Sequence, residues 1–152
     1  MNYVNQLTKT LDGYYAKSPA LPANIKDLLV SIAPWVTLIA GVLALLSGLS
    51  LFSLLGLATS VAGPYMAAAG LGGFAVTAIL SLLILFVTGV IYLLAFSPLK
   101  GRKVKGWNYM LYAMLLYVLS AVVRLNVLDV VWSLVGFAVG YYFLYQVRSH
   151  YH

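Results

Sequence analysis

Long apolar runs are the feature that most constrains the fold of this chain. Residues rich in Leu, Val, Ile, Ala and Phe recur from position 28 to position 147, and only 8% of the 152 residues are charged. An ordinary soluble domain carries roughly 25% charged residues, so this composition cannot cover a water-soluble surface. A helix needs about 20 apolar residues to cross a hydrocarbon core roughly 30 Å thick. The sequence therefore predicts an all-α, polytopic integral membrane protein.

We expect about four transmembrane helices within one domain over residues 21–152. The predicted spans are about 28–57, 74–96, 107–123 and 127–147. Pro34 is expected to kink or restart the first span, and Ser97-Pro98 to end the second. The third span has about 17 residues, or roughly 26 Å of helix, which is slightly short for the hydrocarbon core.

The segment 59–73 holds several helix breakers, Gly63-Pro64 and the glycines at 70, 72 and 73. We predict an external loop here. The alternative is a re-entrant segment, whose backbone would be tolerated at membrane depth only if it were buried in protein or lined a water-filled cavity. The loop is the simpler interpretation because it needs no such cavity.

Residues 1–20 precede the spans as a separate segment. Apolar residues at three-and-four spacing predict a short amphipathic helix that lies in the membrane interface and ends at Gly13 or at Ser18-Pro19. A frayed polar terminus is the alternative, because Gly13 weakens a helix. Pro19 and Pro22 predict an extended connector to the first span. The apolar positions are Val4, Leu7, Leu11, Tyr14 and Tyr15.

The basic residues predict the orientation. Four crossings place both termini and the loop after the second span on one side of the membrane, and all nine Lys and Arg residues except Arg124 fall on that side. The positive-inside rule makes this side cytoplasmic. We therefore predict cytoplasmic termini in the inner membrane of a bacterium. The residues on the predicted cytoplasmic side are Lys9, Lys17, Lys26, Lys100, Arg102, Lys103, Lys105 and Arg148.

The inventory of reactive side chains argues against an enzyme. Cysteine is absent, the three acidic residues are scattered aspartates, and the two histidines, His150 and His152, stand at the C-terminus. No span carries two groups able to exchange protons together, and the histidines lack further ligands for a metal. We expect no cofactor and no metal. Nucleic acid is not an expected partner either, because the charges flank apolar spans instead of forming a soluble basic face.

Three groups of residues are candidate sites. Arg124 and Asp129 flank the turn before the last span and predict an ion pair there, with Asn126 capping the helix; a contact for an ion or substrate at the outer mouth is the alternative. Small residues predict close helix packing, within the monomer or between copies: Gly136 and Gly140 in the last span, and Ala40, Ala44 and Gly48 in the first. A basic cluster, Lys100, Arg102, Lys103 and Lys105, is expected to attract anionic lipid headgroups.

Three short motifs resemble a group of small, uncharacterised four-span bacterial membrane proteins. They are Leu21-Pro22-x-Asn24-Ile25-Lys26 leading to Ala33-Pro34-Trp35, then Gly106-Trp107-Asn108, and finally Phe143-Leu144-x-Gln146-Val147-Arg148. The resemblance covers most of the chain from residue 20 onward. It implies a four-span fold and no established activity, and it assigns no site residue.

These observations predict a small non-enzymatic membrane protein that is a structural or accessory component of the membrane or of a larger complex. Membrane lipids, further copies of the chain or a larger membrane complex are the expected partners. The alternative is an oligomeric pore or a transporter of small solutes or ions. Its lining would come from small hydroxylated residues, which also bond to their own helix backbone: Ser47, Ser50, Ser53, Thr77, Ser81 and Thr88.

Overall fold

The protein is all-helical in a computed structural model, which describes residues 2–69 and 72–151. Five α-helices and a short 3₁₀ turn make up these residues: α1 Asn2–Tyr15, α2 Ala23–Ala68, α3 Gly72–Lys100, α4 Val104–Val123, α5 Val127–Val147 and η1 Arg148–His150. Helices α2 to α5 are each long and apolar enough to cross a membrane. The predicted fold class, with four apolar spans after a short N-terminal helix, is confirmed.

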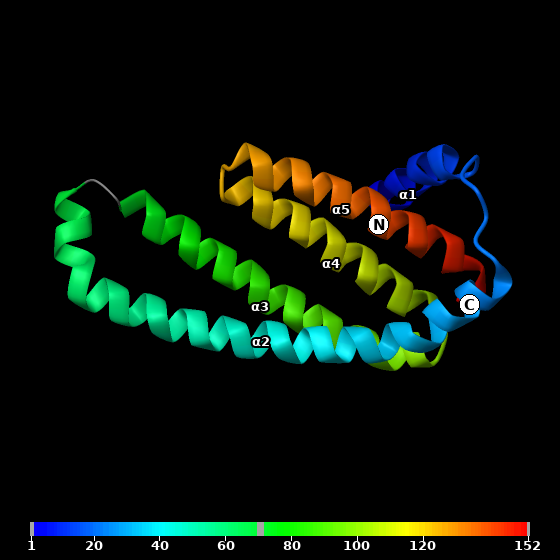
Figure 1. Ribbon diagram of the computed structural model, residues 1–152, viewed down its shortest axis with the longest axis horizontal. Helices are drawn as coiled ribbons and strands as arrows, with labels where there is room; N and C mark the ends of the chain where they lie inside the picture. Colours follow the sequence, from blue (N-terminus) through cyan, green and yellow to red (C-terminus); the bar gives the residue numbers. More distant parts are fainter. Residues whose placement is uncertain (1, 70–71, 152) are drawn as a thin grey trace.

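The four long helices form two helical hairpins packed side by side (Figure 1). Helix α3 lies between α2 and α4, α5 packs on α4, and α1 packs against α5. The start of α2, the α3–α4 turn and the C-terminus gather at one end of the bundle, on the right in Figure 1. We call this the basic end, because it holds Lys26, Arg148 and the basic cluster.

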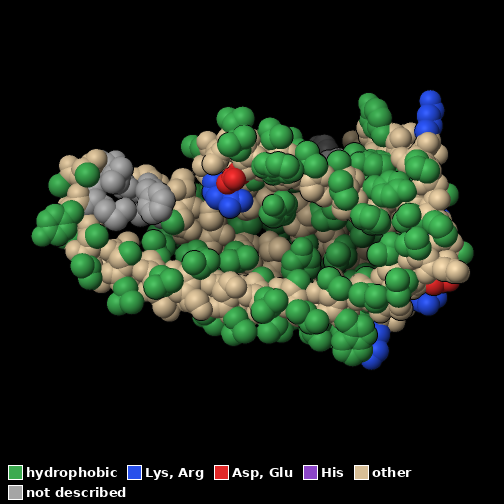
Figure 2. All heavy atoms as spheres, in the orientation of Figure 1, with side chains coloured by type: hydrophobic (Ala, Val, Ile, Leu, Met, Phe, Trp, Pro, Cys, Tyr) green, Lys and Arg blue, Asp and Glu red, His purple; other side chains and the backbone are tan. Residues whose placement is uncertain are grey.

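The long helices turn their apolar side chains outward. Ile39, Leu43, Leu83 and Val139 each expose more than half of their surface, and apolar side chains cover most of the face drawn in Figure 2. A soluble bundle would bury such residues, whereas lipid is as apolar as they are. Because every spanning segment is a helix, its backbone groups are paired within the segment, as the hydrocarbon core requires.

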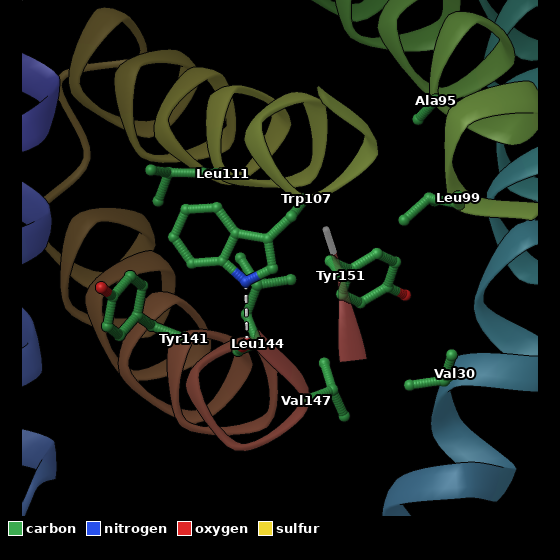
Figure 3. Packing of buried hydrophobic residues seen from close by; sticks show 9 residues of the cluster. All are labelled: Val30, Ala95, Leu99, Trp107, Leu111, Tyr141, Leu144, Val147 and Tyr151. Atoms are coloured by element: carbon green, nitrogen blue, oxygen red, sulfur yellow. Dashed lines mark hydrogen bonds between the residues drawn. The ribbon is translucent and has the colours of Figure 1, made fainter. Parts of the chain in front are cut away.

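The buried core lies at the basic end. Trp107 of α4 is at its centre, between Leu111 of its own helix and Tyr141, Leu144 and Tyr151 from the C-terminal part of the chain (Figure 3). Val30 of α2 and Ala95 and Leu99 of α3 complete the cluster from the other side, with Val147 of α5. This core ties all four long helices together at one end.

The predicted external loop over 59–73 is wrong. Helix α2 continues through Gly63 and Pro64 to Ala68, so the connection to α3 shrinks to residues 69–71, of which 70 and 71 lie outside the described residues. Proline removes one backbone donor and bends a helix without having to end it, and α2 continues for four residues after Pro64. Figure 1 shows the last turns of α2 bending toward α3, as expected for a helix with an internal proline.

Two further boundaries differ from the sequence prediction. Ser97-Pro98 does not end the second span, because α3 runs through Pro98 to Lys100. The carbonyls of Ser97, Pro98 and Leu99 then accept the amides of residues 101–103, which closes the turn. Helix α4 begins at Val104, three positions before the predicted start, and α5 occupies the predicted range. Pro34 likewise lies inside a continuous α2.

The two hairpins differ in length. Helix α2 has 46 residues and α3 has 29, whereas α4 has 20 and α5 has 21. At 1.5 Å per residue α2 contains roughly 69 Å of helix, about twice the thickness of a hydrocarbon core. Because the hairpins are aligned at the basic end, the α2–α3 hairpin extends well past the α4–α5 turn at the other end (Figure 1).

Candidate functional site

Helix α1 is held against α5 by a small polar network. The Asp12 carboxylate accepts a hydrogen bond from the Tyr141 hydroxyl at 2.9 Å and forms an ion pair with the Arg148 guanidinium. The Tyr15 hydroxyl donates to the Ala138 carbonyl at 2.9 Å, and its ring lies 5.4 Å from that of Tyr141. The short helix predicted over this region is therefore present as α1, with Asp12 bonded to α5 and with Leu11 and Tyr15 packed against the buried core. The side chains of Val4 and Leu7 lie outside the described residues.

The connector after α1 is extended, as its prolines predict, and α5 satisfies its backbone. The Pro19 carbonyl accepts hydrogen bonds from the Tyr142 hydroxyl at 2.7 Å and from the Gln146 amide at 3.1 Å. The Gln146 side-chain oxygen in turn accepts the Leu21 amide at 3.4 Å. An extended segment has no internal hydrogen bonds, so these side chains replace the partners that a helix would supply.

Trp107 fastens the end of α5. Its indole Nε1 donates to the Leu144 carbonyl at 2.9 Å (Figure 3). The last carbonyls of a helix have no partner within the helix, and in a buried position each one needs another donor. The Arg148 guanidinium lies 4.9 Å from the centre of the Trp107 ring, in cation–π geometry. One tryptophan therefore joins α4 to the C-terminal turn.

A cavity of about 680 Å³ opens at the basic end among α1, the connector and the C-terminal turn. Lys26, Gln146, Arg148 and Ser149 contribute polar atoms to it, and Trp107 and Tyr151 contribute ring surface. Burial raises the pKa of the Tyr151 hydroxyl, and the positive charge of Arg102 opposes that shift. The Arg148 charge in this lining is paired with Asp12, and Lys26 adds a second positive charge.

His150 pairs with an aspartate of α2. In the part of the chain that the structure describes, no group of three or more His, Asp, Glu or Cys side chains lies close enough to hold a metal ion. His150 lies in η1 with its Nε2 3.3 Å from an Asp27 carboxylate oxygen, so it joins the C-terminal turn to the start of α2. His152 lies outside the described residues.

The basic cluster lies on the α3–α4 turn. The Lys100 ammonium stands 5.9 Å from the centre of the Trp35 ring and 6.0 Å from that of Phe96, in cation–π geometry with both. Arg102 has a left-handed backbone with φ of 50°, Lys103 caps α4 without a side-chain bond, and Lys105 is the second residue of that helix. All four residues of the cluster are exposed.

The predicted packing residues face neighbouring helices of the same chain. Gly48 lies against the Phe86 ring and Ala44 against Gly89, both across the α2–α3 contact. Gly140 lies against Met114 of α4, whereas Gly136 has only the Tyr117 ring nearby, at 3.9 Å from the Cβ position. Ala40 is half-buried. The tightest positions also include Gly41, Gly89 and Gly106, which the sequence analysis did not select.

Arg124 and Asp129 come together at the α4–α5 turn. The Arg124 Nε lies 3.5 Å from an Asp129 carboxylate oxygen, and both side chains are more than a third exposed. The Asn126 side chain accepts the Leu128 amide at 3.0 Å and so caps α5. Leu125 completes the turn with φ of 53°, a left-handed backbone that is uncommon for a residue other than glycine.

A groove of about 640 Å³ runs between α2 and α4, with α3 between its walls. Figure 2 shows the surface hollowed in this region. Most of its lining is apolar, contributed by leucines and alanines of α2 and α3. The polar groups that line it include the side chains of Ser81, Thr88, Ser120 and Arg124.

The structure does not gather the predicted pore residues along one path. Only Ser81 and Thr88 of the six line the groove. The hydroxyls of Ser50, Ser53, Thr77 and Thr88 donate to carbonyls four residues earlier in their own helices. Ser47 is exposed on α2. Ser81 differs from the others, because its buried hydroxyl oxygen has no hydrogen-bond partner among the described residues.

The sequence carried no local signal for the Asp12 network or for the groove. Asp12 and Arg148 are 136 positions apart, and the groove collects residues from three helices. Comparison of the chain with protein-family models, with curated proteins and with solved structures gives no match. The resemblance to small four-span bacterial proteins therefore stays a prediction.

Proposed function

We propose that this protein is a non-enzymatic accessory component of the membrane that associates with another membrane protein chain. The observation that carries the proposal is the uncovered end of the α2–α3 hairpin. Residues 59–68 of α2 lie beyond the groove, and they form about 15 Å of helix. Val61 and Tyr65 in this segment are each at least 75% exposed.

The difference in hairpin length supports this role. If the shorter α4–α5 hairpin matches the hydrocarbon core, the far end of α2–α3 stands at or beyond the headgroups. Exposed apolar surface costs free energy there, at roughly 25 cal/mol per Å², unless another chain covers it. The helix could also tilt to stay in lipid, but the packing of the hairpins at the basic end restricts that tilt.

The proposed orientation follows the basic residues. The basic end faces the cytoplasm of a bacterial inner membrane, with Lys100, Arg102, Lys103 and Lys105 against anionic headgroups. Both termini are then cytoplasmic, and the α2–α3 extension meets its partner on the other side. A membrane-impermeant label should modify a cysteine placed at Leu125 from outside spheroplasts, and one placed at Lys103 only after lysis.

Site-specific photocrosslinking in native membranes tests the association. A photoreactive residue at Val61 should give one discrete protein adduct, either a dimer or a complex with a second chain. The same residue at Val139, which is exposed on α5, serves as the control and should give lipid adducts. Lipid adducts alone at both positions would contradict the accessory role.

An oligomeric pore or small-solute transporter is the second candidate. It is favoured by Ser81 and Thr88, which line one groove and would face a shared path if copies closed it. The test is solute or ion flux into liposomes that contain the protein. Flux that falls when Ser81→Ala and Thr88→Val are combined would support a transporter and contradict the accessory role.

A further inference from the structure

Within the mostly apolar lining of the groove between α2 and α4, three polar side chains lie close together: Ser81, Ser120 and Arg124. Gly106 of α4 lies against Leu99 of α3, and an equal step along each antiparallel helix reaches Arg124 and Ser81. These two polar side chains therefore stand at the same level, at the end of the bundle away from the basic cluster. Ser120, one helical turn before Arg124, lines the groove beside them.

We propose that this groove binds one acyl chain of an anionic phospholipid, with the lipid phosphate at Arg124. The apolar lining matches the chain, and the volume of about 640 Å³ falls within the range of ligand pockets, roughly 300–1,000 Å³. The proposal is independent of the accessory role, since it concerns a different surface from the far end of the hairpin.

Specificity for an anionic lipid has to come from the polar side chains, Arg124 above all. An acyl chain gains no hydrophobic free energy when it moves from bilayer to groove, because lipid tails are as apolar as leucine side chains. The guanidinium of Arg124 carries five N–H donors in a planar fork that suits phosphate oxygens. Its contact with Asp129 is through Nε, and no hydrogen bond from its terminal nitrogens occurs among the described residues.

Ser81 supplies the second observation. Its hydroxyl oxygen is buried in the groove wall without a hydrogen-bond partner in residues 2–69 and 72–151, whereas Thr88, two turns away, bonds to its own helix. A buried hydroxyl without a partner is costly, so a polar ligand atom at this level would satisfy it. The glycerol or ester oxygens of a phospholipid lie between phosphate and chain, which is the place that Ser81 offers.

Asp129 gives the proposal a sharp test, because the substitutions of Asp129 and Arg124 should change lipid affinity in opposite directions. If the pair only stabilised the turn, neutralising either residue should have the same effect. As a phosphate site, Arg124→Gln should lower affinity, whereas Asp129→Asn should raise it by removing a repelling carboxylate. Each change should be roughly fivefold, the effect of one charge near a membrane surface.

The experiment measures the phospholipid that the purified full chain retains in native mass spectrometry, with phosphatidylglycerol and phosphatidylcholine offered in equal amounts. All variants carry Lys103→Gln and Lys105→Gln, which reduces binding at the basic end. Thr88→Phe, which fills the groove two helical turns from Ser81 toward the basic end, should abolish the preference for phosphatidylglycerol. Val90→Phe, on the exposed face of the same helix, is the matched control and should retain it.

Three results would overturn the proposal. Equal retention of both lipids by the parent chain would show that no anionic site exists, and unchanged retention after Arg124→Gln would remove the phosphate contact. Competition by water-soluble glycerol phosphate as strong as by the lipid would assign the site to a free anion. If Thr88→Phe fails to fold by circular dichroism, Leu51→Trp fills the groove from the α2 wall, and an unchanged preference for phosphatidylglycerol in that variant would contradict the proposal.

Discussion

The close backbone contact between α3 and α4 makes a quantitative prediction about Gly106. A methyl group added at this position would stand 2.7 Å from the Leu99 amide nitrogen, 2.9 Å from Leu99 Cγ and 3.0 Å from its Cα. Two of these atoms are backbone, and the Leu99 carbonyl is fixed in the turn by the Arg102 amide. The added methyl group therefore cannot be accommodated by a side-chain rotation.

The expected magnitude comes from two opposing effects. Overpacking of a close contact costs about 1–3 kcal/mol. Replacing glycine by alanine inside a helix contributes up to about 1 kcal/mol in the other direction. Gly136→Ala is the control, because it makes the same substitution within a helix, while its added methyl group meets only the Tyr117 ring at 3.9 Å. The free energies of unfolding of the two variants should therefore differ by about 2 kcal/mol, with Gly106→Ala the less stable.

Reversible unfolding in mixed micelles measures this difference. Denaturing detergent is titrated into folded protein, and helix content reports the transition for the parent chain and both variants. Gly136→Ala should unfold at the same or a higher denaturant fraction than the parent, and Gly106→Ala at a clearly lower one. Equal stability of the two variants would refute the tight α3–α4 contact, and with it the packing that aligns the hairpins.

Three further predictions concern single side chains. Trp107→Phe should cost about 1–3 kcal/mol, because it leaves the buried Leu144 carbonyl without its donor, and the same micelle titration measures it. Asn126→Ala should cost about 1 kcal/mol through loss of the α5 cap, and amide exchange should increase in the first turn of that helix. Because burial raises the pKa of the Tyr151 hydroxyl, the folded chain holds that proton more tightly than the unfolded chain. The free energy of unfolding should therefore fall as pH rises above about 10, and less steeply in Tyr151→Phe. An unchanged slope in that variant would contradict the assignment.

The sequence predicted the parts of the fold that depend on local chemistry. Helix α5 occupies the predicted range because a polar turn precedes it and charge follows it, with Asn126 as a cap that is recognisable from its type and position. The amphipathic spacing before residue 15 likewise predicted α1. The errors occurred at Gly63-Pro64 and at Ser97-Pro98, where residues that end helices in water lie inside helices here.

The candidate sites differ in the same way: a site within one turn was predictable, and a site formed between helices was not. The Arg124–Asp129 pair was predictable, since the two residues flank one short turn and need no knowledge of other helices. The alternative use of the hydroxyls as a pore lining depended on which helix faces meet, and the structure places only Ser81 and Thr88 in one groove. The apolar periodicity of these spans is weak, because lipid and protein interior both accept apolar side chains, so the sequence does not mark the buried face.

The amino-acid sequence by itself determined that this is a membrane protein, that it has about four apolar helices long enough to span the bilayer, and that most basic residues lie at one end of them. Those properties follow from the composition and length of each apolar run, which can be counted segment by segment without knowing how the segments pack. Only the tertiary structure decided that Asp12 meets Tyr141 and Arg148, that Gly106 contacts Leu99, and that a groove lined by Ser81 and Arg124 forms among three helices. Such contacts depend on helix rotation and register, which apolar surfaces in an apolar solvent leave undetermined until side chains pack against one another.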